Sequence, residues 1–254
     1  MKGWLLVVLA ALVAIGCSSE PKRKVEPHKA AEINAQLGVQ YMNQGSYDIA
    51  LAKFKKALKQ NPDSVAAHNG IAILYETLGE TRLAEKHYRK AVSLGPKDSF
   101  ALNNYGQYLC RTGRWKDAER YFKKATRDPL YKTPEVALTN AGICAWQAGE
   151  QDKAEQYLRA ALEANPLDPR ALFQMAKLSF SQGNYLRTRA YLQRYEQVAS
   201  HTPESLWLGI ETEKRLGDSS AVASYSMLLQ DRFPESPQAR GLRAGAVDER
   251  TGGN

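Results

Sequence analysis

Residues 99–149 read SFALNNYGQYLCRTGRWKDAERYFKKATRDPLYKTPEVALTNAGICAWQAG, and this stretch contains about one and a half periods of a longer repeat. Two of its glycines belong to a series separated by 34, 34, 36, 34 and 34 residues, at Gly45, Gly79, Gly113, Gly149, Gly183 and Gly217. Four of these are followed seventeen residues later by a proline, at Pro62, Pro96, Pro166 and Pro234. Because such glycines favour turns of positive φ and proline ends a helix, each period predicts a helix, a turn and a second helix.

The period and its signature residues resemble the tetratricopeptide repeat. The first unit carries the pattern of small and aromatic residues at Leu37, Gly38, Tyr41, Ala50, Phe54 and Ala57. We therefore expect an all-α, right-handed superhelical solenoid of six helix-turn-helix units, at 31–64, 65–98, 99–132, 135–168, 169–202 and 203–236. The aromatic positions are interpreted as core and not as a cofactor site. The two extra residues lie between units three and four, where a kink or an opening of the groove is expected.

The N-terminal residues have the pattern of an export signal. Lys2 precedes a twelve-residue apolar run, WLLVVLAALVAI, which as a helix reaches roughly 18 Å and so is too short for a hydrocarbon core of about 30 Å. The following AIGCSS resembles a bacterial lipobox, with Cys17 as the acylated, palmitate-bearing first residue; the alternative is a cysteine near an ordinary cleavage site. Ser18 after the cysteine implies delivery to the outer membrane. We expect a signal peptide at 1–16, a flexible tether at 17–30 and a flexible tail at 237–254.

Composition and charge limit the possible functions but do not identify one. The chain has 254 residues, 43% apolar and 24% charged, so disorder throughout is excluded. Its net charge of +8 is compatible with nucleic acid, anionic lipid or an acidic partner, and export argues against nucleic acid. Basic runs such as KFKKALKQ fall on second helices and are interpreted as solvated surface, with contact to anionic lipid as the alternative.

No catalytic motif occurs in the sequence. It contains no phosphate-binding loop, GxSxG elbow or HExxH helix. The histidines at 28, 68, 87 and 201 are scattered and show no metal-ligand spacing. We expect a protein that is not an enzyme and that has no cofactor, no metal and no small-molecule substrate.

Two cysteines remain once Cys17 is assigned to lipid. Cys110 and Cys144 lie on the first helices of units three and four, which stack side by side in such solenoids. In an oxidising compartment this arrangement predicts a disulfide across the joint, the alternative being two buried thiols.

NNYGQYLCRTGRW and ATRDPLYKTPEVALTNAGICAWQAGE are similar to units three and four of the type IV pilus biogenesis lipoproteins of the PilF/PilW kind. The layout of lipobox, tether, six repeats and one cysteine pair fits that family. The resemblance implies a pilotin, a lipid-anchored protein on the periplasmic face of the outer membrane, monomeric alone. Such a protein binds the pilus secretin subunit and promotes its localisation and multimerisation, hence pilus biogenesis and twitching motility.

The inner surface of the solenoid is the candidate binding site. First helices line it, and positions 2, 5, 9 and 12 of each unit point into it. Without Glu32, Ala66, Glu76 and Cys110, the first three units place there Ala35, Val39, Met42, Asn69, Ile73, Phe100, Asn103 and Gln107. The apolar members are expected to bury partner side chains while the amides bind its backbone; the alternative is that some contact the neighbouring helix. No cluster of Lys, Arg and Asn is present to clamp a terminal carboxylate, which favours an internal or hydrophobic segment.

Two other functions stay open. An outer-membrane scaffold for cell-wall or envelope-assembly proteins shares the lipid and the repeats, but the motif in unit three does not favour it. A hydrolase would require a cluster of ionisable groups in the groove.

Overall fold

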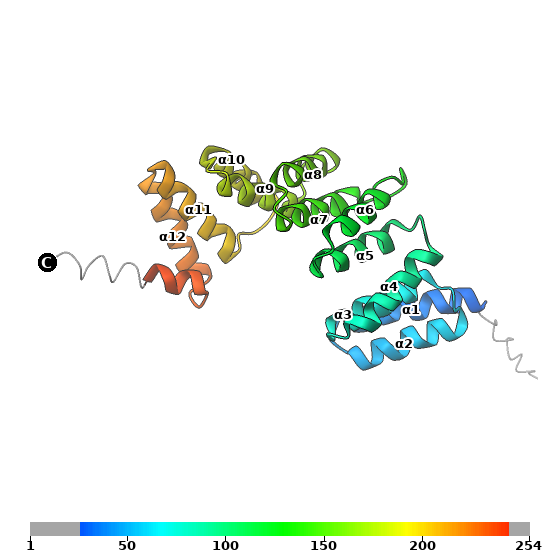
Figure 1. Cartoon of the computed structure of the whole chain (residues 1–254). Coiled ribbons are helices and arrows are strands. Elements are labelled where there is room, and N and C mark those ends of the chain that lie inside the picture. The colour runs from blue at the N-terminus through cyan, green and yellow to red at the C-terminus, as the bar shows by residue number, and fades with distance from the viewer. Residues whose placement is uncertain (1–25, 244–254) are drawn as a thin grey trace, which may run out of the picture.

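The structure, a computed structural model, describes residues 26–243. The predicted signal peptide, Cys17 and most of the predicted tether lie outside the described residues, as do residues 244–254. The labelled helices are α1 (Pro27–Asn43), α2 (Tyr47–Gln60), α3 (Val65–Thr77), α4 (Thr81–Leu94), α5 (Ser99–Arg111), α6 (Trp115–Ala125), α7 (Pro134–Gln147), α8 (Gln151–Ala164), α9 (Pro169–Ser181), α10 (Tyr185–Glu196), α11 (Pro203–Leu216) and α12 (Ser219–Arg232). The predicted all-α repeat solenoid is confirmed, and the described residues contain no strand (Figure 1).

The ends of the helices follow from local chemistry. The Ser64 side chain accepts the Ala67 N–H at 3.2 Å, and the Asp98 side chain accepts the Ala101 N–H at 2.8 Å, which satisfies donors that the first turn leaves free. The six repeat glycines have φ between 73° and 81°, as expected. A Cβ at Gly45 would meet nothing within 4 Å, so the left-handed backbone and not lack of space selects glycine in this turn.

One large side chain fills the centre of each of the first five units. Phe54, Tyr88, Phe122, Leu158 and Leu192 occupy the same position of successive second helices, and each is at most 2% exposed. Close packing depends on small partners: a Cβ at Gly70 would lie 2.3 Å from a ring carbon of Phe54. The core is therefore a row of similar joints between each unit and the next.

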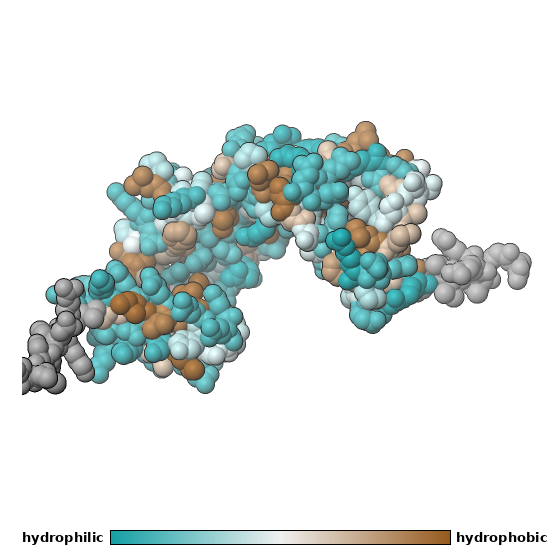
Figure 2. All heavy atoms as spheres, turned by 180° about the vertical axis from the view of Figure 1, so that it is seen from behind, coloured by the Kyte–Doolittle hydropathy of each residue, from teal (hydrophilic) through white to brown (hydrophobic). Residues whose placement is uncertain are grey.

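The two helices of a unit have different neighbours. Each first helix packs closely against the first helix of the next unit, in the series α1, α3, α5, α7, α9 and α11. Consecutive second helices lie farther apart and meet through long side chains, such as Tyr157 of α8, whose hydroxyl donates to Glu119 of α6 at 2.8 Å. The first helices therefore form the inner row and the second helices the outer row. Seen from behind, the molecule is an arch whose two ends hang below the middle, and the apolar side chains on that face form small patches between polar ones (Figure 2).

Both predicted flexible ends were set too wide. Pro27 opens α1, so residues 27–30 are helical, because proline fits the first turn of a helix. Residues 237–243 of the predicted tail are also helical. Ala239 is fully buried in one cluster with Leu206, Ile210 and Leu229, because this segment covers the apolar end of the last unit.

Candidate protein-binding groove

The predicted groove residues divide by exposure. Val39 is 40% and Phe100 60% exposed, which leaves both available to a partner. Partly buried are Met42, Asn69, Ile73 and Gln107. Ala35 is 3% exposed because it packs with other alanines in the α1–α2–α3 core, and Asn103 is 4% exposed. The prediction that these two line an open surface is therefore wrong.

Asn103 belongs to a chain of hydrogen bonds along the first helices. The Asn104 amide donates to Asn69 at 3.4 Å, and the Asn103 amide donates to Asn104 at 3.4 Å. Asn140 donates to Asn103 at 2.9 Å, and Arg170 donates to Asn140 at 2.8 Å. This amide ladder joins α3, α5, α7 and α9. Its side chains bind one another, so they stabilise the floor of the groove more than they serve a partner backbone.

An open pocket of about 230 Å³ lies beside the ladder, between α5, α7 and α9. The polar and apolar side chains that line it are Gln107, Arg111, Asn140, Ile143, Gln147 and Arg170, with Cys110 and Phe122. The groove residues predicted from the sequence all lie in units one to three, so the pocket's fourth- and fifth-unit members are not among them. Ile143 stands at position 9 of unit four and Arg170 at position 2 of unit five, so the same rule extended to these units finds both, but it does not find Asn140 and Gln147 at positions 6 and 13 of unit four.

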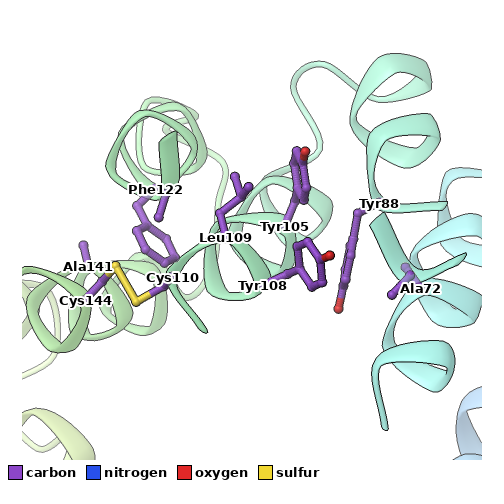
Figure 3. Packing of buried hydrophobic residues seen from close by; sticks show 11 residues of the cluster. Ala72, Tyr88, Tyr105, Tyr108, Leu109, Cys110, Phe122, Ala141 and Cys144 are labelled. Atoms are coloured by element: carbon purple, nitrogen blue, oxygen red, sulfur yellow. A yellow bond between two sulfur atoms is a disulfide. The ribbon is translucent and has the colours of Figure 1, made fainter. Parts of the chain in front are cut away.

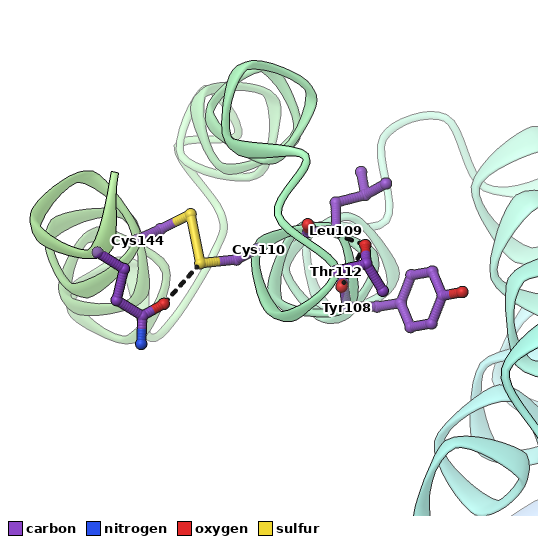
Figure 4. Close-up of a disulfide and its surroundings, with 6 residues drawn as sticks. Tyr108, Leu109, Cys110, Thr112 and Cys144 are labelled. Carbon is purple, nitrogen blue, oxygen red and sulfur yellow. Dashed lines mark hydrogen bonds between the residues drawn. A yellow bond between two sulfur atoms is a disulfide. The ribbon is translucent and has the colours of Figure 1, made fainter. Parts of the chain in front are cut away.

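A disulfide joins the two walls of this pocket. Cys110 of α5 and Cys144 of α7 are bonded, with Cα atoms 5.7 Å apart (Figure 4). They are 6% and 3% exposed and pack in one cluster with Phe122 and Ala141 (Figure 3). The Gln147 side-chain oxygen lies 3.4 Å from the Cys110 sulfur. The bond therefore fixes α5 against α7 near the C-terminal ends of both helices.

The joint between units two and three is aromatic and charged. Tyr88 packs against Tyr105 and Tyr108, with ring centroids 5.8 and 5.1 Å away (Figure 3). The Tyr88 hydroxyl donates to Glu76 at 2.8 Å, and Arg111 donates to the other oxygen of Glu76 at 2.7 Å. Burial raises the pKa of Tyr88, so this hydroxyl stays protonated and keeps its bond. Glu76 thus holds Arg111 at the edge of the pocket.

Two histidines that are far apart in sequence meet within unit two. Nδ1 of His68 lies 2.9 Å from Nδ1 of His87, and Nε2 of His68 lies 3.1 Å from the Pro62 carbonyl oxygen. Burial lowers the pKa of both rings, that of His87 to about 4. The spacing of 19 residues did not predict this contact, because the two histidines are brought together by the antiparallel packing of α3 and α4. No group of three His, Cys, Asp or Glu side chains in residues 26–243 is placed to hold a metal.

Comparisons with known proteins agree with this architecture. A family model described as tetratricopeptide repeat matches residues 36–99, 71–132, 104–169 and 139–201. The chain is 29% identical over 240 residues to "Type IV pilus assembly protein PilF" of Pseudomonas aeruginosa, covering 94% of this chain and 95% of that protein.

Solved structures agree as well. The crystal structure of PilW, described as a widely conserved type IV pilus biogenesis factor, superposes with a TM-score of 0.77 at 33% identity over 84% of this chain and 97% of that one. The structure of Pseudomonas aeruginosa PilF superposes with a TM-score of 0.76 at 29% identity over 86% and 99%. The chain therefore belongs to the tetratricopeptide repeat family and, within it, to the type IV pilus biogenesis proteins related to PilF and PilW.

Proposed function

We propose that this protein is a pilotin, an outer-membrane lipoprotein that binds the type IV pilus secretin subunit and promotes its localisation and multimerisation. The observation that carries the proposal is the likeness to type IV pilus proteins along nearly the whole chain, which includes the joint between units three and four. The geometry of the inner surface supports a binding role. It offers exposed apolar side chains and, between α5, α7 and α9, a polar pocket on a floor that the amide ladder and a disulfide hold in place.

Binding is divided between two parts of the inner surface. Val39 and Phe100, with Ile73 between them in sequence, bury apolar side chains of the secretin segment and supply most of the affinity. Arg111 and Arg170 lie on the polar side, where they donate hydrogen bonds to carbonyl or carboxylate groups of the segment. Arg111 is already paired with Glu76 and Arg170 with Asn140, so both are oriented before the partner binds.

The protein reaches the membrane through lipid on Cys17, with the repeats on the periplasmic face. The described residues contain no helix that is long and apolar enough to cross a membrane. Several acyl chains on one residue would hold the protein at the membrane far more firmly than the roughly 10⁴ M⁻¹ of a single chain. The protein acts by binding, without a catalytic step.

The test is membrane fractionation with a secretin immunoblot under non-denaturing conditions. We expect secretin multimers to be lost on deletion of the protein and to be mislocalised with Cys17→Ala. Phe100→Glu should reduce multimers at a normal level of the protein, because it puts a charge on the apolar part of the inner surface. Leu186→Glu is the matched control, since Leu186 is 67% exposed on the second helix α10. Unchanged outer-membrane multimers in the deletion strain would overturn the proposal and favour an envelope scaffold.

A further inference from the structure

The net positive charge of the described chain lies in its first half. Residues 26–132 contain 18 lysines and arginines against 11 acidic residues, a net charge of +7. Residues 133–243 contain 12 against 13, a net charge of −1. The basic half is the one that follows the predicted lipid attachment site. A field of this sign attracts an anionic surface to that end of the arch.

Within the basic half, two adjoining pockets on the outer side share Pro96 and Lys124. One, of about 440 Å³, is lined by Lys97, Lys124 and Arg127 with Asp128 and two prolines. The other, of about 240 Å³, extends between α4 and α6 and includes Val92, Leu102 and Tyr121. We call this pair of pockets the basic groove. It lies at the C-terminal ends of α4 and α6, among second helices, whereas the protein-binding groove lies among first helices.

Three of the four cations of the basic groove are not neutralised by the rest of the described chain; the fourth, Arg89, pairs with Glu85 at 2.8 Å. Lys97, Lys124 and Arg127 are exposed, and none of them forms an ion pair within residues 26–243. The acid in the groove, Asp128, accepts a hydrogen bond from the Leu130 N–H at 2.9 Å and so stabilises its own turn. Lys97, Lys124 and Arg127 thus outnumber the single carboxylate of the groove, which has the charge to receive a phosphate-bearing ligand.

An apolar side chain projects beside these cations. Leu130, in the connector from α6 to α7, is 83% exposed, the largest exposed fraction among the large apolar side chains of residues 26–243. Tyr121 lies below Lys124, whose Nζ is 5.5 Å from the ring centroid. A protruding leucine flanked by lysine, arginine and tyrosine matches the chemistry of the membrane interface, where apolar groups enter and basic groups meet phosphate. A protein partner would more often be met by a concave apolar slot.

We propose that the basic groove and Leu130 form a second membrane contact, which binds anionic phospholipid headgroups while Leu130 enters the interfacial layer. This inference does not depend on the identity of the protein partner. Basic side chains near an anionic surface each add to its binding, and a nearby lipid anchor would raise the effective concentration of headgroups at the groove. Contact on the outer side would leave the first helices, and the groove between them, directed away from the bilayer.

The test measures co-sedimentation of the chain from Ser18 onward, which contains every described helix and has no acyl group. The vesicles are phosphatidylcholine with or without phosphatidylglycerol. We expect binding only with phosphatidylglycerol and a loss on raising the salt concentration. The variant Lys97→Gln/Lys124→Gln/Arg127→Gln should bind about tenfold or more weakly. The matched control is a second triple variant with the same change of net charge on α2, namely Lys55→Gln/Lys56→Gln/Lys59→Gln, and it should keep most of the binding.

A pair of leucine variants tests the insertion. Leu130→Ser should weaken vesicle binding several-fold, whereas Leu186→Ser, which changes a similarly exposed leucine on α10, should not. Equal losses in the two triple variants would mean that net charge alone is responsible and would overturn the site. Vesicle binding that is absent, or that does not depend on phosphatidylglycerol, would overturn the membrane contact. Capture of an acidic protein by the groove without vesicle binding would do the same. Circular dichroism of each variant confirms that it is folded.

Discussion

The bond between Cys110 and Cys144 gives a prediction whose size follows from its place in the chain. The variant Cys110→Ala/Cys144→Ala removes a cross-link between residues 34 apart in sequence. By the chain-entropy relation, a loop of this length constrains the unfolded state by about 4 kcal/mol. We expect the free energy of unfolding to fall by this order, since the two side chains are nearly buried and alanine fits beside Phe122 and Ala141.

The loss should be concentrated at one joint, because each unit of a solenoid contacts only its neighbours. Urea unfolding followed by circular dichroism should show an earlier and broader transition in the variant. Hydrogen exchange should rise most along α5 and α7, which form the walls of the pocket. Under the proposed function, the affinity for a secretin segment should also fall, because α5 and α7 would no longer be held in alignment.

Reductant provides the control. Adding it to the wild-type protein should move the urea midpoint to that of Cys110→Ala/Cys144→Ala, and it should not affect the variant. If the wild type shows no change with reductant and both cysteines titrate as free thiols, the cysteines are two buried thiols. The alignment of α5 with α7 would then not depend on a covalent bond, contrary to the structure.

Three further predictions test the packing and the buried polar groups. Gly70→Ala should destabilise the protein by about 1–2 kcal/mol in thermal unfolding, because the added Cβ would overlap the Phe54 ring, and this outweighs the helix preference of alanine of about 1 kcal/mol. Gly45→Ala is the comparison, since there the added Cβ meets no atom and only the left-handed backbone of the turn is strained. Burial lowers the pKa of His87 from 6.5 to about 4, so the unfolded chain binds a proton at a higher pH than the folded chain does. The folded state should therefore lose stability as the pH falls from about 6.5 to 4. Urea titrations at several pH values should show a smaller loss for His87→Gln. Arg189→Ala should cost about 3 kcal/mol in urea unfolding, since it leaves the 3% exposed Glu213 without its cation, and addition of Glu213→Gln should restore part of the loss.

The sequence by itself determined the repeat, the type of each element and the family. These features are local: a glycine every 34 residues specifies a turn of positive φ, a proline ends the second helix, and the spacing of small and large residues sets the buried face. Helices begin at Val65, Ser99, Pro169 and Pro203, the starts expected for four of the units. The outer connector between units three and four also follows from the two-residue insertion.

Only the tertiary structure decided which side chains of different units meet. Position 5 of unit three binds position 6 of unit four in the Asn103–Asn140 contact, so a rule based on one fixed position could not have predicted the amide ladder. The basic groove likewise combines Lys97 with Arg127, thirty residues away. Periodicity gives the face on which a residue lies, but the partner on that face depends on how neighbouring helices are displaced and tilted. That displacement is set by the packing of whole units, which no short stretch of sequence encodes.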